Sequence, residues 1–306
     1  MRGPDWASVL DALRQRGWIA RVVPVERVDQ AHRRVTACLT SGELPAETAA
    51  HLAAEVAVRM PTTVARPRSV VVAAIGRPLT RAVLTADGVE SAVPVPPHYA
   101  GYHTTPGVLE AALRELPELR GRQTALCAAP LKALAAGAGL SSYGRNNVTY
   151  VPGIGSYLLL AACVTDAPPP DDCRWGEATL LRRCERCVAC ARACPTAAIG
   201  GERFLLHTER CLTCLNESEA PFPSWLDPAW HSCAVGCLRC QQACPENAAV
   251  TLRVEPPERF DAAETAAILA GDQAALPAAT RAKLARCGLD YSAPLIARNL
   301  RALLGR

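Results

Sequence analysis

Cysteine is the residue type in this chain whose number and spacing most clearly indicate chemistry. The chain has 306 residues and 15 cysteines, and ten of these lie between residues 184 and 244. Disulfides do not persist in the cytoplasm, so a cytoplasmic chain with this many cysteines is expected to bind metal or to do redox work. The cysteine-rich segment is therefore the first candidate for a functional centre.

The first run of cysteines has the spacing C-x2-C-x2-C-x3-C-P, from Cys184 to Pro195. Bacterial-type ferredoxins hold [4Fe–4S] clusters with this run: the three close cysteines bind one cluster, and the cysteine before proline binds a second. The weaker alternative is structural zinc, which usually uses two separate C-x2-C pairs. The run therefore predicts two clusters.

A second run, from Cys237 to Pro245, repeats the end of this pattern but has Ala234 where another cysteine would stand. One ligand must then come from elsewhere in the chain. Cluster one is predicted to use Cys184, Cys187, Cys190 and Cys244, and cluster two to use Cys194, Cys237, Cys240 and one of Cys211, Cys214 or Cys233. The scattered Cys38, Cys127, Cys163, Cys173 and Cys287 are expected to be small buried hydrophobic residues.

Composition narrows the class of protein. Half of the residues are hydrophobic and 20% are charged, which predicts a folded core, and the formal net charge of +4 does not by itself indicate a nucleic-acid or membrane-surface protein. No apolar stretch approaches the roughly 20 residues that span a bilayer, and the first residues lack the apolar core of a signal peptide. We therefore expect a cytoplasmic protein with no membrane partner.

The segments around the cysteines predict an α+β fold. Apolar periodicity predicts helices near 5–16, 45–59, 106–116 and 130–138, and strands near 18–24, 69–75, 123–128 and 156–164. The proline-rich segment 167–172 predicts a linker. The expected domains are an α/β domain (1–166), a ferredoxin-like double-cluster domain (167–255) and a short helical tail packing on the core (256–306).

Several motifs give the chain a resemblance to the epoxyqueuosine reductase family, cobalamin-dependent iron-sulfur enzymes related to reductive dehalogenases. The resemblance covers residues from about Arg66 to Asn247. It is carried by Arg66–Ala73, Tyr99 with Tyr102-His103, Ala129–Leu140, Tyr143–Asn147 and Gly155-Ser156. It implies a cobalamin-binding, reductive dehalogenase-like first domain. It also selects Cys211 as the fourth ligand of cluster two, because the family has Arg-Cys between its cysteine runs, and leaves Cys214 and Cys233 as non-ligands.

The resemblance also implies a binding site for cobalamin with its base displaced. The residues implied to bind it are Tyr99, Ala129, Tyr143, Gly144, Arg145, Asn146, Asn147, Gly155 and Ser156, and those implied to be catalytic are Cys127, Tyr102 and His103. Cys127 stands where the family's reductases carry an aspartate that is the presumed proton donor. It is expected to be either a proton source or cobalt ligand, or a buried apolar thiol.

These observations predict a cobalamin-dependent iron-sulfur oxidoreductase in which two [4Fe–4S] clusters deliver electrons to a base-off corrinoid that reduces a small-molecule substrate. An external donor such as ferredoxin or flavodoxin would supply the electrons. One alternative is an electron-transfer protein or reductive activator of a corrinoid enzyme. The other is an epoxyqueuosine reductase acting on tRNA. We expect tRNA to be an unlikely partner because the aspartate and a C-terminal helical-repeat domain are missing and the net charge is low.

Overall fold

The computed structural model describes residues 3–200 and 204–305. Its internal contacts divide the chain into two units. Unit 1 consists of Met1–Gly76 and His103–Cys187, and unit 2 consists of Arg77–Tyr102 and Val188–Arg306. Each unit therefore combines two separate stretches of the chain. The domain boundaries expected after residues 166 and 255 stay predictions.

Unit 1 contains a four-stranded sheet in the order β1 (Trp18–Pro24), β2 (Ser69–Gly76), β8 (Leu158–Thr165) and β5 (Thr124–Leu126). All three strand pairings are antiparallel. Sheets of the α/β class are usually parallel, so the α/β domain expected here has the layers of that class without its strand direction. The apolar sequence of the strands could not distinguish a parallel from an antiparallel sheet, because β2 is buried on both faces in either case.

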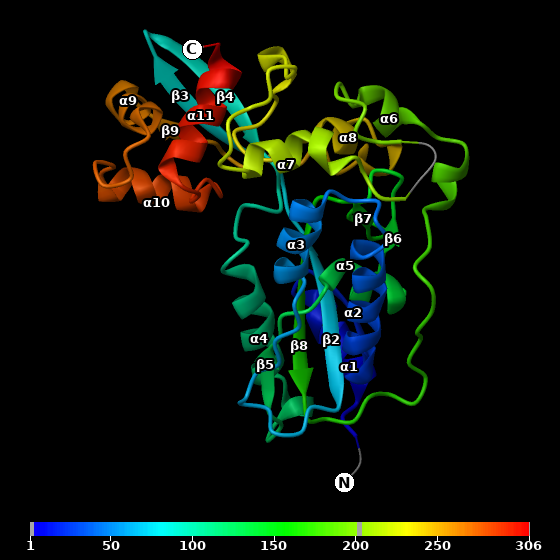
Figure 1. The fold of residues 1–306 in the computed structure, drawn as a ribbon. Helices are drawn as coiled ribbons and strands as arrows, with labels where there is room; N and C mark the ends of the chain where they lie inside the picture. The colour runs from blue at the N-terminus through cyan, green and yellow to red at the C-terminus, as the bar shows by residue number, and fades with distance from the viewer. Residues whose placement is uncertain (1–2, 201–203, 306) are drawn as a thin grey trace. The chain divides into compact units, whose positions relative to one another are not determined.

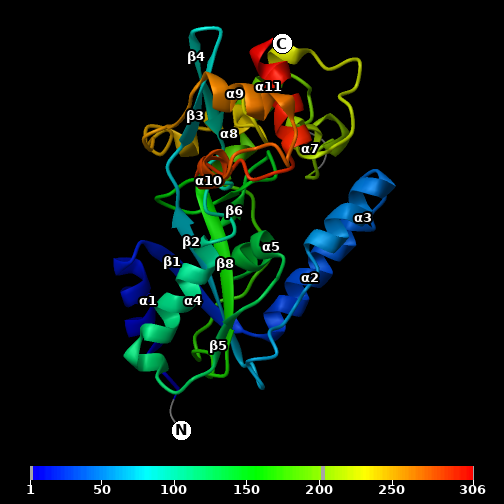
Figure 2. The same ribbon diagram turned by 90° about the vertical axis from the view of Figure 1, so that its left-hand side faces the viewer.

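Helices cover both faces of this sheet (Figures 1 and 2). On one face, α1 (Trp6–Gln15) and α4 (Thr105–Glu115) pack against Val71 and Ala73 of β2. On the other face, α2 (Glu26–Leu39) and α5 (Leu131–Gly137) pack against Val70 and Val72. Because successive strand residues point to opposite faces, one apolar strand supplies two cores. A further helix, α3 (Ala46–Glu55), contacts α2.

Unit 2 contains a three-stranded sheet in which β3 (Thr80–Ala86) pairs antiparallel with β4 (Val89–Val95) and parallel with β9 (Glu258–Phe260). The β3–β4 connection is Asp87-Gly88, and both residues have positive φ, 51° and 76°. A two-residue hairpin turn of this type needs positive φ at both positions, and Asp-Gly supplies it at little cost. This hairpin was not among the predicted elements.

Three helices follow β9 in unit 2: α9 (Ala262–Ala270), α10 (Ala278–Arg286) and α11 (Ala293–Leu304). They share a core with the sheet, in which Phe260, Leu284 and Ile296 are almost fully buried. The cysteine-rich part of unit 2 forms only short helices: α6 (Ala189–Ala193), α7 (Leu212–Glu217) and α8 (Arg239–Gln242).

Every helix and strand predicted from the sequence is present, with ends shifted by a few residues, and the α+β class is confirmed. Helix α2 was missed because its sequence is mostly polar and buries only Val28 and Ala31. Within the described part of the chain, no helix is long and apolar enough to cross a membrane. The cytoplasmic location stays a prediction.

Candidate iron-sulfur centre and cofactor face

The part of the first cysteine run that belongs to unit 1, with Cys184 and Cys187, lies next to a short hairpin of β6 (Ser142–Tyr143) and β7 (Thr149–Tyr150). Tyr143 bridges to Leu180, just ahead of the 3-10 helix η2 (Arg182–Glu185) that carries Cys184. The backbone N–H of Arg145 donates to Cys184 Sγ at 3.4 Å. Its Nε donates to the carbonyl oxygen of Cys187 at 3.2 Å, and its Nη2 donates to the carbonyl oxygen of Cys184.

These contacts place Arg145, predicted to bind the cofactor, against the cysteine run itself. A backbone donor directed at a ligand sulfur stabilises its thiolate form, and such donors tune iron-sulfur clusters. The predicted ligands of cluster one are divided between the units, with Cys184 and Cys187 in unit 1 and Cys190 and Cys244 in unit 2. Their joint coordination stays a prediction.

The turn that presents Arg145 is stabilised by its own side chains. Asn146 is 2% exposed, and its Nδ2 donates to Tyr150 Oη at 2.9 Å. A Cβ added to Gly144 would lie 2.6 Å from the Tyr150 ring and would also meet Asn146 Oδ1, so only glycine fits there. Asn147 has a positive φ of 57°. In this structure Asn146 therefore supports the turn.

Three of the cysteines predicted for cluster two lie together in unit 2. Burial raises the pKa of the Cys237 thiol, and the nearby sulfurs of Cys211 and Cys194 raise it further, because close like charges oppose ionisation. Helices α6 and α8, which carry Cys190 and Cys240, pack against each other. This proximity of the two runs is what the crossing arrangement of ligands requires.

The three candidates for the fourth ligand differ in their surroundings. A hydrogen bond from the Cys214 side chain, followed by the backbone N–H groups of Cys214 and Thr213, lowers the pKa of Cys211 to about 6 against the opposing effect of burial. Burial instead raises the pKa of Cys233 to about 12. Because the thiolate is the form that binds metal, the surroundings of Cys211 are compatible with the ligand role that the resemblance implies. Its selection over Cys214 and Cys233 stays a prediction.

Comparison with known proteins identifies the cysteine-rich segment. Residues 183–247 match the family described as a 4Fe-4S double cluster binding domain. Over 117 residues the chain is 37% identical to the epoxyqueuosine reductase of Pseudomonas aeruginosa, and over 153 residues it is 36% identical to that of Synechococcus sp.. The chain is a relative of the epoxyqueuosine reductases. The matches cover 38% and 46% of this chain, and 31% and 44% of those two reductases.

Solved epoxyqueuosine reductases share the fold. A crystal structure of a selenomethionine-labelled epoxyqueuosine reductase has a TM-score of 0.66 at 19% identity, covering 98% of this chain and 80% of that one. Another, with an epoxyqueuosine-modified tRNA-Tyr stem loop, has a TM-score of 0.64 at 18% identity and the same coverage. A third, from Bacillus subtilis, has a TM-score of 0.62 at 18% identity and also covers 98% of this chain and 80% of that one; its catalytic aspartate loop is swung out of the active site.

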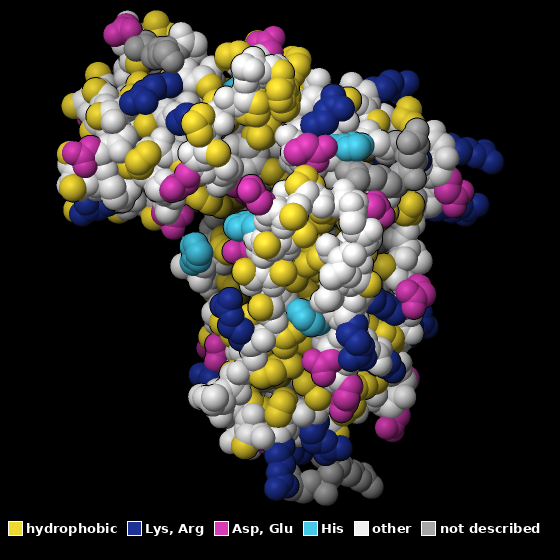
Figure 3. Space-filling model, in the orientation of Figure 1, with side chains coloured by type: hydrophobic (Ala, Val, Ile, Leu, Met, Phe, Trp, Pro, Cys, Tyr) yellow, Lys and Arg dark blue, Asp and Glu magenta, His cyan; other side chains and the backbone are white. Residues whose placement is uncertain are grey.

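These findings support two [4Fe–4S] clusters and correct two expectations. The expected main function, reduction of a small molecule by a corrinoid enzyme, is wrong, and so is the expectation that tRNA is an unlikely partner, because the relatives are epoxyqueuosine reductases and one is solved with a tRNA stem loop. A net charge averages the surface and does not report local cationic regions. Figure 3 shows lysine and arginine side chains over α6. Exposed arginines also lie in the first cysteine run or just before it: Arg182, Arg183, Arg186 and Arg192.

Unit 1 also contains glycines with free space around them and buried side-chain donors without a hydrogen-bond partner in the part of the chain that the structure describes. Gly139 and Gly153 have positive φ, and no heavy atom lies within 4 Å of where a Cβ would be. Ser141 Oγ and Trp175 Nε1 are buried and make no hydrogen bond to the described residues. The Trp175 ring lies against Gly137, where an added Cβ would be 2.5 Å from it. A large ligand with acceptor groups, such as a corrin with its amide arms, fits this combination.

Neither Ser141 nor Trp175 was predicted from the sequence to bind a cofactor. Trp175 lies just beyond the proline-rich linker, and no local pattern marks it as facing α5. The other predicted cofactor residues of unit 1 lie nearby in sequence: Ala129 precedes α5, and Ser156 is buried beside Gly155, whose N–H donates to the carbonyl of Val151 at 3.0 Å. Their predicted role remains a prediction.

Tyr99 belongs to unit 2 and is 6% exposed. Its hydroxyl donates to Glu217 of α7, and its ring lies against Gly236, where an added Cβ would be 2.7 Å from Tyr99 Cε2. In this structure Tyr99 thus supports the loop that leads into Cys237. Tyr102 and His103, predicted to be catalytic, are both exposed.

Cys127 follows β5 in the core of unit 1 and is 9% exposed. Its thiol contacts the carbonyl oxygen of Ala162 at 3.7 Å, and burial raises its pKa to about 12. A thiol with this pKa is a weak acid and is scarcely ionised at neutral pH. Of the two sequence-based alternatives, these surroundings favour the buried apolar thiol.

Arg145 provides a direct test of how the first cysteine run is held. In Arg145→Met the backbone donor remains, but the guanidinium contacts to the carbonyls of Cys184 and Cys187 are lost. Because supporting contacts around metal ligands are worth tenfold or more in affinity, we expect cluster absorbance to decay about tenfold faster in chelator. Arg182→Met removes an exposed arginine of the same run and should decay like the unchanged protein. Equal decay in both variants would show that the side chain is dispensable.

The buried thiols of unit 1 predict sensitivity to alkali. Burial raises the pKa of Cys127 to about 12. Burial also raises the pKa of Cys163, and the nearby Cys127 raises it further. In the unfolded chain these thiols ionise near about 8.5, so their contribution to stability is complete below that pH and is lost as pH rises toward the folded values. The loss should reach about 1.4 kcal/mol per pH unit for each thiol.

Anaerobic thermal unfolding between pH 8 and pH 11 measures this effect. The melting midpoint of the unchanged protein should fall with pH, and that of Cys127→Ala/Cys163→Ala should start lower but fall less steeply. Val108→Ala alters an exposed side chain of α4 that does not titrate and should keep the original slope. Parallel slopes for all three proteins would assign the alkaline loss to other groups.

Proposed function

We propose that this chain is an iron-sulfur reductase that acts on epoxyqueuosine in tRNA. The observation that carries the proposal is the double-cluster segment 183–247, set in a chain whose fold matches solved epoxyqueuosine reductases over 98% of its length. The relatives from Pseudomonas aeruginosa and Synechococcus sp. carry the same name. The chain aligns with less than half of their length, so substrate and activity are inferred from the shared part.

The proposed reaction consumes two electrons, which the clusters would deliver one at a time. Breaking both C–O bonds of an epoxide to leave a carbon–carbon double bond takes two electrons and two protons and releases the oxygen as water. Two [4Fe–4S] clusters, when bound, supply one-electron transfer. The chain's own part is to hold eight thiolates. Arg145 donates toward Cys184, and the Cys214 thiol with two backbone N–H groups stabilises the thiolate of Cys211. Exposed arginines along the first run would pair with tRNA phosphates.

The proposal includes cobalamin as a second cofactor, on unit 1. Gly139 lets the backbone approach a flat macrocycle, and Ser141 Oγ and Trp175 Nε1 would donate to acceptor groups of that ligand. When bound, cobalamin would supply a cobalt centre that passes electrons to the epoxide. Cys127 remains protonated in the apolar core, so in this proposal the two protons come from solvent.

The test is an anaerobic assay on tRNA that contains epoxyqueuosine, with the product nucleoside measured by mass spectrometry. The protein with both clusters, cobalamin and a chemical reductant should convert epoxyqueuosine, and Cys184→Ala should not. Arg14→Met changes an exposed arginine paired with Asp11 in unit 1 and should convert as well as the unchanged protein.

Two results would contradict the proposal separately. Conversion at the same rate without cobalamin would show that cobalamin is not a cofactor of the proposed reaction. No conversion by protein that retains about eight irons and binds cobalamin would remove epoxyqueuosine as the substrate.

A further inference from the structure

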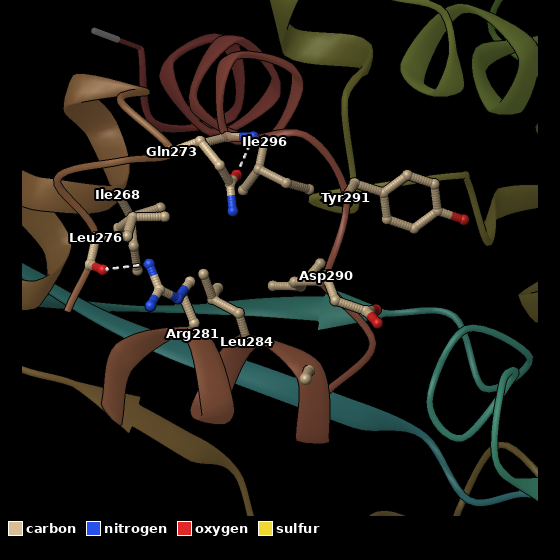
Figure 4. Close-up of a pocket in the computed structure, with 11 residues that line it drawn as sticks. Ile268, Gln273, Leu276, Arg281, Leu284, Asp290, Tyr291 and Ile296 are labelled. Atoms are coloured by element: carbon tan, nitrogen blue, oxygen red, sulfur yellow. Dashed lines mark hydrogen bonds between the residues drawn. The ribbon is translucent and has the colours of Figure 1, made fainter. Parts of the chain in front are cut away.

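Helices α9, α10 and α11 of unit 2 line a half-open cavity of about 210 Å³ (Figure 4). Its inner wall is aliphatic and includes the buried side chains of Ile268, Leu284 and Ile296. At about 30 Å³ for each water-sized group, the space accommodates roughly seven such groups. The cavity therefore has the size for a small molecule with an apolar portion.

Two polar side chains at the cavity present donors. The Gln273 carbonyl oxygen accepts the N–H of Ala293 at 3.0 Å, which leaves the amide nitrogen directed into the cavity (Figure 4). Arg281 Nη1 donates to the carbonyl oxygen of Leu276 at 3.0 Å, which fixes the plane of the guanidinium and leaves its other N–H groups available. Both side chains are exposed at the mouth of the cavity, and one hydrogen bond to the backbone orients each of them.

Arg281 also differs from the other cations of its helix. On α10, Lys283 pairs with Glu264 at 2.7 Å and Arg286 pairs with Glu258 at 2.6 Å. Among the described residues no carboxylate pairs with Arg281. A guanidinium presents a planar fork of donors that matches a carboxylate. The cavity thus combines an aliphatic wall with an unmatched carboxylate-binding group.

The remaining charge at the rim restricts the kind of anion. Asp290 also lines the cavity, and Figure 4 shows its carboxylate directed away from Arg281. A nearby negative charge opposes a doubly charged phosphate about twice as strongly as a singly charged carboxylate. The arrangement therefore favours a monoanion over a phosphate ester.

We propose that this cavity binds a short aliphatic monocarboxylate, with the carboxylate on Arg281 and Gln273 and the alkyl chain against Ile268, Leu284 and Ile296. The same chemistry occurs in a free short-chain acid and at the C-terminal residue of a peptide that ends in an aliphatic side chain. The proposal concerns a site that the proposed reductase reaction does not use.

Isothermal titration of the cluster-loaded protein with hexanoate tests the proposal. Small ligands of this size reach dissociation constants of about 1 mM, and saturable binding in that range is expected. Acetate, which lacks the chain, and 1-hexanol, which lacks the carboxylate, should bind at least tenfold more weakly. A peptide ending in leucine with a free carboxylate, compared with its amidated form, distinguishes a chain terminus from a free acid as the source.

Variants locate the binding. Arg281→Met should weaken hexanoate binding about tenfold or more, since it removes a charge-assisted contact. Ala285→Phe fills the cavity from an exposed position on α10 and should abolish binding. Arg14→Met, with the same change in net charge, should bind as the unchanged protein does. Absence of saturable binding, or equal binding by Ala285→Phe in a protein that keeps its melting midpoint, would overturn the proposal.

Discussion

Replacing Cys211 by alanine should reduce the iron content from about eight to about four atoms per chain, because Cys211 is predicted to be a thiolate ligand of cluster two. Cys211 lies with Cys237 and Cys194 in unit 2, and it receives donors from Cys214 and Thr213. Conversion of epoxyqueuosine by this variant should fall below detection. Iron and sulfide analysis with EPR spectra of the reduced protein measures the loss.

Cys214→Ala is the matched control, one helical turn away. Its thiol supports Cys211 through a hydrogen bond and is not predicted to bind iron. This variant should retain about eight irons, with the cluster more readily lost in chelator because one supporting contact is gone. A protein that keeps eight irons as Cys211→Ala but drops to four as Cys214→Ala would reverse the assignment of the ligand.

The largest expected loss of stability outside the cysteines is at Gly288, which follows α10. Gly288 has a φ of 79°, and a Cβ added there would lie 2.6 Å from both the backbone nitrogen of Ala100 and the carbonyl carbon of Tyr99. Backbone atoms cannot move aside as a side chain can. Gly288→Ala therefore combines left-handed strain of about 1 kcal/mol or more with overpacking of about 1–3 kcal/mol.

Gly88→Ala separates these two contributions. Gly88 has a φ of 76° in the β3–β4 turn, but nothing lies within 4 Å of its added Cβ. Its melting midpoint should fall by a few degrees, and that of Gly288→Ala by about two to three times as much, at one scan rate under anaerobic conditions. A similar fall of the melting midpoint in the two variants would mean that the backbone at Tyr99 and Ala100 moves aside without loss of stability.

The chemistry of the cysteine-rich segment could be predicted because ligand spacing is a local property of the chain. Cys184, Cys187, Cys190 and Cys194 are separated by the two or three residues that cluster binding requires, and the family match over 183–247 agrees with this. Apolar periodicity likewise located most helices and strands of unit 1, although not α2, β6 or β7. Asp87-Gly88 was an available local signal for the β3–β4 hairpin, although the prediction did not use it.

The expectation of a small-molecule substrate did not rest on a local pattern of this kind. The net charge of +4 and the cysteine in place of the family's aspartate favoured a small molecule, yet neither reports what a surface binds. Curated relatives of 37% and 36% identity carry the name epoxyqueuosine reductase, and the solved structure with a tRNA stem loop, at 18% identity, shares the fold.

The sequence by itself indicated two [4Fe–4S] clusters held by cysteines, the α+β class and most elements of unit 1. Tertiary structure decided the contacts between residues far apart in the chain. Arg145 meets Cys184 across 39 positions, and Tyr99 meets Glu217 across 118. Nor does any local pattern place Gln273 and Arg281 around one cavity. Such contacts depend on how separate segments pack, and packing is set by the combined shape of many side chains rather than by any local spacing.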